Sequence, residues 1–435
     1  MNALLVATDQ KDAPRVRALI EGAANPDAVI DSIYQQGGTK QHSFSTFRMD
    51  DAAAGEQMEY AWEQLHYGDW QDVDPKWRQL YGRSALVVAR ARLAEGRAAE
   101  ALRTCDLILM LGGPGFATAI ADTVAECERA LSCSDVSIGA PAADSSASHV
   151  AAAAAPPVAA TSPPPNLKRK RNQATSRASQ LVRRVLSLRA FRTEHMRPSL
   201  PVVLGGVLSE WPALERWNDL AYLRRAMGHR TVPIEIGSRY TSAEWRQQLM
   251  TVDAFIDGHV LQRRGADAAG ETVGGTPTAY LAQHRLFDQI PALAADIALP
   301  DFCTMTLDPD MTSAPTVEVN AWFGPAGTVS PAHFDPKHNL LCQVVGAKLV
   351  KLWSPAHSAA LYPRDDVMSN TSRVDVDLDE TCASYAAPDA AEFPLFAEAP
   401  CFECVLSPGE TLYIPPGWWH FCKAKSLSFS VSFWW

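Results

Sequence analysis

A stretch rich in alanine, proline and serine, residues 134–176, divides this chain of 435 residues into two parts of different pattern. It includes the runs Ala151 to Ala155 and Pro163 to Pro165, and it has few residues that can build a core. We therefore predict a disordered linker at residues 134–176, between a domain at residues 1–133 and a second domain at residues 177–435.

The first part has a helical pattern. Apolar residues recur at helical spacing from Met58 to Leu111, Gly96 suits a turn between two helices, and a further helix is expected from Thr118 to Leu131. No period is repeated three times, so we expect a small helical bundle rather than a solenoid of repeats. An all-helical unit of this kind suits protein interaction, although we read its aromatic residues mainly as core.

The second part has short apolar or alternating runs separated by turn residues, the pattern of strands in a β-sandwich or barrel. An open barrel mouth is also a natural place for a small ligand. The predicted strands are Pro201–Leu204, Thr231–Ile236, Thr316–Phe323, Leu340–Val345, Lys348–Trp353, Cys401–Leu406, Thr411–Ile414 and Ser426–Trp435.

Charge and cysteine content limit the partners and the compartment. The net charge is −10, but residues 166–197 hold ten Lys or Arg and one Glu, a local +9 that leaves −19 for the rest. Direct nucleic-acid binding is therefore not expected, and Lys168 to Arg171 is read either as a nuclear-import signal or as a solvated linker. With no apolar run long enough to cross a bilayer and no disulfide framework among nine cysteines, we expect a nuclear or cytoplasmic protein without a membrane partner.

A candidate metal site is formed by His333 and Asp335, an H-x-D pair, with His420 as a third ligand far downstream. On a strand, residues i and i+2 point to the same side, so His333 and Asp335 can reach one ion. Two imidazoles and one carboxylate suit a non-haem Fe(II) oxygenase. An isolated H-x-D pair is weak evidence, because a solvated turn before a proline has the same pattern.

Alternation places Lys348 on one face of its strand and Lys351 on the other, and either face could be the inner one. A lysine that points into the barrel needs an anionic partner, for which a ligand carboxylate would serve. In the last strand Leu427, Phe429, Val431 and Phe433 alternate with Ser428, Ser430, Ser432 and Trp434. The second row could line a cavity, although a half-exposed strand has the same pattern.

Several longer segments resemble the jumonji-C (JmjC) family of Fe(II)- and 2-oxoglutarate-dependent oxygenases. The resemblance is strong over about residues 180–435 and weaker over the helical part. It implies an α+β protein with a C-terminal double-stranded β-helix, a cupin-like jelly-roll barrel, and an all-α N-terminal domain. The segments that carry it are Thr231 to Tyr240, Tyr280 to Pro291, Asn320 to Pro325, Asn370 to Ser372 and Leu427 to Trp435.

The resemblance also implies a complete site. Its metal ligands fall on His333, Asp335 and His420, which would act with Fe(II), 2-oxoglutarate and O₂. Its 2-oxoglutarate contacts fall on Tyr280, Ser330, Asn339, Lys348 and Trp434, with Lys348 holding the distal carboxylate. An acid and an aromatic residue that recognise a substrate arginine fall on Glu235 and Trp322, and a carboxylate suits a guanidinium because the contact is bidentate and charge-assisted.

The first functional expectation is therefore hydroxylation of an arginine in a protein substrate, with release of succinate and CO₂. The alternative within the same chemistry is demethylation of methyl-lysine or methyl-arginine on histone tails, a role in chromatin regulation. A histone-tail peptidase and a non-catalytic scaffold are less favoured, because no separate nucleophile is arranged and the ligand set is complete. Two loops, Gly265 to Thr278 and Asp379 to Glu392, look expanded and leave the substrate protein open.

Overall fold

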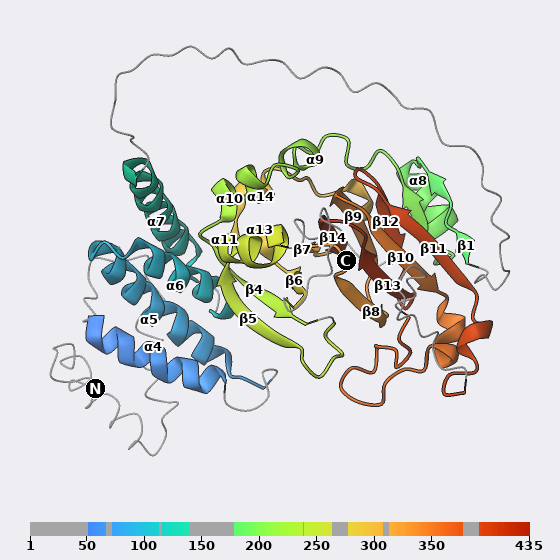
Figure 1. Ribbon diagram of the computed structural model, residues 1–435, viewed down its shortest axis with the longest axis horizontal. Coiled ribbons are helices and arrows are strands. Elements are labelled where there is room, and N and C mark those ends of the chain that lie inside the picture. Colours follow the sequence, from blue (N-terminus) through green and yellow to red (C-terminus); the bar gives the residue numbers. More distant parts are fainter. Residues whose placement is uncertain are drawn as a thin grey trace, which may run out of the picture.

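The computed structural model describes residues 51–66, 72–112, 115–138, 178–237, 239–262, 277–307, 313–376 and 391–435 (Figure 1). Most of the predicted linker, including the basic run Lys168 to Arg171, and most of the two expanded loops lie outside these residues. No helix of the described residues is long and apolar enough to cross a membrane.

The described N-terminal residues form four helices: α4 (Asp51–Leu65), α5 (Pro75–Ala94), α6 (Ala98–Leu111) and α7 (Ala117–Ile138). Helices α5 and α6 meet at Gly96, which has a φ of +79° and so makes the predicted turn. The break before α5 was not predicted. It arises because Pro75 begins the helix and the Asp74 carboxylate accepts a hydrogen bond from the backbone N–H of Lys76, which together start a new helix. Helix α7 continues five residues past residue 133.

Fourteen strands of the described residues form two sheets. The first has the order β2-β3-β12-β9-β14-β7-β6-β4-β5 and the second β1-β11-β10-β13-β8. The strand bounds are β1 Ser179–Gln180, β2 Arg183–Arg184, β3 Val202–Leu204, β4 Thr231–Ile236, β5 Arg246–Thr251, β6 Ala279–His284, β7 Glu318–Gly324, β8 Val329–His333, β9 Asn339–Val345, β10 Lys348–Trp353, β11 Cys401–Leu406, β12 Thr411–Ile414, β13 Trp419–Ala424 and β14 Ser428–Trp434.

The two sheets pack face to face around an apolar interior. Val350 and Cys404 of the second sheet share one cluster with Leu341 and Leu412 of the first. This is the predicted barrel. Sequence patterns missed six strands. Strands β1 and β2 have only two exposed residues each, too few to show a pattern, and β5 is polar and largely exposed. Strands β6, β8 and β13 are mostly buried and interrupted by polar residues, so that none alternates cleanly.

Short helices cover the outer face of the larger sheet, on the side that faces the N-terminal helices in Figure 1. There the Phe429 ring of β14 packs on Trp217, with ring centroids 4.3 Å apart. The serines of β14 therefore face the barrel interior, which resolves the question of its two faces. The helices of this region are α9 Ala213–Arg216, α10 Leu220–Met227, α11 Val252–Phe255, α13 Leu286–Gln289 and α14 Pro291–Ala294. Helix α8 (Leu188–Phe191) lies at the other end of the sheet, near β1, where Phe191 packs on Tyr413 of β12 (Figure 1).

Candidate active site

The three predicted metal ligands lie together. His333 at the end of β8 and His420 in β13 are directly opposite each other in an antiparallel pair, and their ring centroids are 4.2 Å apart. Asp335 Oδ2 lies 3.6 Å from His420 Nε2. One ligand atom from each of the three residues lies within 4.8 Å of the others, so that a single ion can contact all three.

Asp335 is not on a strand, contrary to the geometry expected for the H-x-D pair, because β8 ends at His333. The backbone after the strand is held by its neighbours instead. Phe334 donates its N–H to Asn370 O at 3.0 Å, and Gly417 donates to Asp335 O at 2.8 Å. These contacts fix the turn that brings Asp335 beside His420.

Both histidines present the same nitrogen to the ion. His333 Nδ1 lies 2.7 Å from Pro331 O, and His420 Nδ1 lies 3.0 Å from Trp418 O. A carbonyl oxygen only accepts, so each Nδ1 carries the proton and each Nε2 keeps a free lone pair. Backbone carbonyls two residues earlier in the chain therefore set the tautomer of both histidines.

Burial keeps His420 neutral. Burial and the nearby His333 together lower the pKa of this imidazole to about 4, although the carboxylate of Asp335 opposes the shift. A neutral imidazole is the form that binds metal.

A buried ammonium group lies in the same barrel as the metal ligands. Lys348 is 3 % exposed and points into the barrel, and its Nζ donates to the Tyr280 hydroxyl at 3.3 Å. Burial lowers the pKa of Lys348 to about 8. It also raises the pKa of Tyr280, an effect that Ser330 partly offsets by a hydrogen bond. Thus Lys348, Tyr280 and Ser330 come together as expected, around a cation that needs an anionic partner.

The other two expected 2-oxoglutarate contacts form a pair. Asn339 in β9 and Trp434 in β14 are opposite each other in the sheet. Their polar side-chain atoms Asn339 Oδ1 and Trp434 Nε1 are buried and have no hydrogen-bond partner. All five expected contacts therefore belong to strands that enclose one barrel.

The residues fit a metal ion and a small dianion. Three buried polar atoms of this region have no hydrogen-bond partner: the carboxylate oxygen Oδ2 of Asp335, the amide oxygen of Asn339 and the indole nitrogen of Trp434. Unpaired buried polar atoms are rare in proteins and costly, so several in one region point to missing ligands. A cation would pair with Asp335, and a carboxylate would pair with Lys348.

The expected substrate acid also lies near this site. Glu235 in β4 is opposite Tyr280 in β6, and the Tyr280 ring lies 6.1 Å from the ring of Trp322. Trp322 is held by its own hydrogen bond to Ser432 Oγ, at 2.9 Å. Burial raises the pKa of Glu235, which an interaction with the Trp245 indole partly offsets. A cationic side chain would restore the charged form of Glu235.

Three further residues were not singled out from the sequence. Trp245 contacts Glu235, and the charges of both Glu235 and Asp335 act on the Tyr240 hydroxyl. The thiol of Cys422 lies in the barrel near Lys348. Period-2 alternation with His420 could have identified Cys422, whereas Trp245 reaches Glu235 only through the β4–β5 pairing.

Comparison with known families agrees with this geometry. A family model described as a cupin-like domain matches residues 188–435, and one described as KDM8-like, N-terminal ARM repeats matches residues 21–137. The second match corrects the expectation of a bundle without repeats. The unit has few helices, so its repeats are too few to show a period in the sequence.

Named relatives cover most of the chain. It is 37 % identical to lysine-specific demethylase 8 of Xenopus tropicalis over 87 % of both chains. It is 36 % identical to lysine-specific demethylase JMJ30 of Arabidopsis thaliana over 95 % of this chain and 92 % of the relative. Jumonji C domain-containing protein 5 of Drosophila melanogaster is 45 % identical over 57 % of this chain and 58 % of its own.

Proposed function

Because the chain belongs to the cupin-like JmjC family of 2-oxoglutarate-dependent oxygenases, we propose that it binds Fe(II) and 2-oxoglutarate at this site and oxidises a C–H bond of a protein side chain. The observation that carries the proposal is the buried Lys348 ammonium in the same barrel as the triad of His333, Asp335 and His420. A triad alone fits many metals, whereas a triad with an inward lysine fits a chelating dicarboxylate.

The chain's own residues bind and orient. His333 and His420 offer Nε2, Asp335 offers Oδ2, and three ligands on one side leave open positions on a metal. When bound, Fe(II) with 2-oxoglutarate and O₂ supplies the oxidising power that converts a substrate C–H to C–OH while succinate and CO₂ are released. Lys348, Tyr280 and Ser330 would hold the distal carboxylate away from water.

Arginyl hydroxylation was the first expectation from the sequence and demethylation the alternative. The comparisons favour demethylation. Two of the relatives carry lysine-specific demethylase in their names, and together they align with most of this chain. Hydroxylation of an N-methyl group releases it as formaldehyde, so demethylation uses the same oxidation. We therefore propose demethylation of methyl-lysine in a protein such as a histone as the leading outcome.

Arginyl hydroxylation remains a second candidate because one feature favours it. Glu235 is a buried carboxylate, and among the described residues no cation is recorded beside it. A planar guanidinium can bind such a carboxylate through two parallel hydrogen bonds, and the ring of Trp322 could lie against its face. A trimethylated lysine has no N–H to offer Glu235.

Mass analysis separates these outcomes. The full-length protein is incubated with Fe(II), 2-oxoglutarate and peptides that carry arginine or methyl-lysine, and the Asp335→Ala variant is the control. Loss of a methyl group supports demethylation, and gain of one oxygen on arginine supports hydroxylation. Absence of succinate and of any mass change with every peptide would overturn the proposed function.

The protein partner and the compartment also stay proposals. We propose a protein substrate and a nuclear or cytoplasmic location, for which the basic run Lys168 to Arg171 is the supporting feature. Fusing residues 166–178 to a fluorescent protein and imaging its distribution tests the import signal. An unchanged distribution would contradict it.

A further inference from the structure

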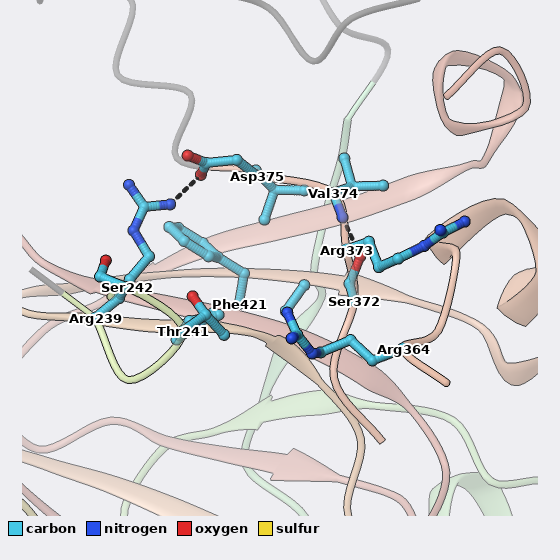
Figure 2. Close-up of a pocket in the computed structure, with 12 residues that line it drawn as sticks. Arg239, Thr241, Ser242, Arg364, Ser372, Arg373, Val374, Asp375 and Phe421 are labelled. Atoms are coloured by element: carbon cyan, nitrogen blue, oxygen red, sulfur yellow. Dashed lines mark hydrogen bonds and ion pairs between the residues drawn. The ribbon is translucent and has the colours of Figure 1, made fainter. Parts of the chain in front are cut away.

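A cavity of about 370 Å³ lies on the opposite side of the β8 and β13 wall from the metal ligands (Figure 2). Ala332 and Phe421, which line it, are the strand neighbours of His333 and His420. Successive side chains of a strand point to opposite faces, so residues next to inward ligands face outward. The cavity therefore lies mainly on the outer face of this wall, although Pro331, two residues before His333 on β8, also lines it.

The lining of this cavity, here called the arginine pocket, is strongly basic. Three of its side chains are Arg239, Arg364 and Arg373, and its one acid is Asp375, so the lining carries +3 − 1 = +2. Figure 2 shows the Arg364 side chain extending toward Phe421 and Thr241, with Arg239 on the far side of them. Hydroxyl groups, including that of Thr241, complete the lining.

Two of the guanidinium groups, those of Arg239 and Arg364, can exchange their present partners for a ligand. Arg239 pairs with Asp375, whose side chain is 59 % exposed, and Arg364 pairs with Asp366 at 2.8 Å, where the acid is 41 % exposed. Exposed ion pairs of this kind contribute little, typically less than about 1 kcal/mol, and are readily exchanged. The Arg373 side chain extends away from Arg239 and Arg364 in Figure 2, and its guanidinium lies 6.0 Å from the Tyr362 ring.

Tyr240 and Thr371 link the arginine pocket to the active site. Tyr240 lies between Arg239 and Thr241, and its hydroxyl is 3.2 Å from Thr371 Oγ1. Thr371 in turn forms a β-bridge with the metal ligand His333. Since the charges of Glu235 and Asp335 both act on Tyr240, this side chain lies at the boundary between the two spaces.

We propose that the arginine pocket binds an anionic group, a phosphate or a carboxylate, which the protein substrate carries close to its target residue. The inference rests on the proposed function, because it places a peptide in the adjacent active site. Guanidinium groups recognise both anions through paired hydrogen bonds. A phosphorylated residue gains more than an acidic one, because its charge is close to −2 and it has three acceptor oxygens.

Paired peptides test the proposal. Each pair has the same target residue, arginine or methyl-lysine, with phosphoserine or serine placed in turn at each flanking position. Binding to the full-length protein is measured by fluorescence anisotropy, and turnover is measured by mass. At one flanking position we expect the phosphopeptide to bind about tenfold more tightly, the size of one charge-assisted hydrogen bond.

Variants assign the effect to the pocket. In Arg364→Gln and in Arg239→Gln the dissociation constant of the serine peptide, divided by that of the phosphopeptide, should fall toward one, and thermal melting confirms that each variant is folded. Arg189→Gln is the matched control, because Arg189 is an exposed arginine of α8 outside the pocket. The Arg189→Gln variant should keep the full preference for the phosphopeptide over the serine peptide. A ratio that survives in both pocket variants overturns the assignment.

Inorganic phosphate distinguishes the source of the anion. If the substrate supplies it, phosphate should compete with the phosphopeptide and not with its serine counterpart. If phosphate binds in a manner that depends on Arg364 and no phosphopeptide gains affinity, the pocket takes a free anion and the proposal is wrong. A preference in binding without any oxidation would instead refute the proposed function and leave the pocket supported.

Discussion

The carboxylate of Asp106 in α6 accepts hydrogen bonds from Nε and Nη2 of Arg230, at 2.9 and 2.6 Å, although the two residues are 124 positions apart. The side chains are 0 % and 2 % exposed. The other carboxylate oxygen accepts from the backbone N–H of Thr231, the first residue of β4, at 2.7 Å. The N-terminal helices are thus joined by a buried ion pair to the base of the strand that carries Glu235.

Replacing Asp106 with alanine should lower the free energy of unfolding by about 3 to 5 kcal/mol, because it leaves the buried Arg230 charge without its main partner. Urea denaturation measures the loss. Asp122→Ala is the control, since Asp122 is exposed on α7 and should change stability by less than about 0.5 kcal/mol. Equal losses in the two variants would contradict the proposed importance of the ion pair.

Removing a metal ligand should remove metal binding without unfolding the barrel. In Asp335→Ala or His333→Ala we expect Mn(II), used in place of iron, to bind at least about 100-fold more weakly, since even indirect partners of ligands cost 10- to 100-fold. Electron paramagnetic resonance of free Mn(II) reports the affinity. His66→Ala serves as control because His66 bonds only to its own helix, at Trp62 O. Unchanged affinity in either ligand variant would exclude that residue from the site.

The affinity for 2-oxoglutarate should fall as the pH rises above about 8. Burial lowers the pKa of Lys348 to about 8 in the protein, below its ordinary value, so the ammonium loses its proton as pH passes that point. Because the anion binds the protonated form, the dissociation constant should rise up to about tenfold per pH unit above it. Binding measured by calorimetry with Mn(II)-loaded protein tests this. A constant affinity from pH 7 to about 9.5 would rule out the role of Lys348.

The same lysine affects stability in the empty protein. A folded pKa below the unfolded one means that the charged form is disfavoured by folding, so the cost is complete below about pH 8 and disappears as the pH rises toward 10.5. Lys348→Met should therefore be more stable than the parent protein near pH 7, and the difference should shrink at high pH. Thermal melting at both pH values measures it, and a less stable variant at pH 7 would contradict the sign.

Glu235→Gln should weaken binding of the protein substrate much more than binding of 2-oxoglutarate. Loss of a hydrogen bond to a charged partner costs about 1.5 to 3 kcal/mol, roughly a 10- to 100-fold rise in the KM for a peptide. Steady-state kinetics with each substrate varied in turn separates the two effects. Glu215→Gln, at an exposed position of α9, is the control. Equal loss for peptide and cosubstrate would contradict the role of Glu235.

Local patterns in the sequence were enough for much of the fold and for the chemistry of the site. Alternation and turn residues placed β4, β10, β11 and β12 at the bounds observed, because each is bordered by turn residues and alternation depends only on neighbours along the chain. The same rule made Lys348 a candidate for an inward ammonium. The H-x-D pair and the distant His420 identified the ligand types, since ligand chemistry belongs to the side chain.

Tertiary structure decided what depends on distant segments. The sequence placed Asp335 on a strand, whereas contacts from Asn370 and Gly417 hold it in a turn. The side of β10 that faces inward follows from its pairing with β11 and β13, and the arginine pocket unites Arg239 with Arg364 across two separate segments. Contacts between distant segments leave no periodic pattern in the sequence, because the residues meet only when the barrel closes.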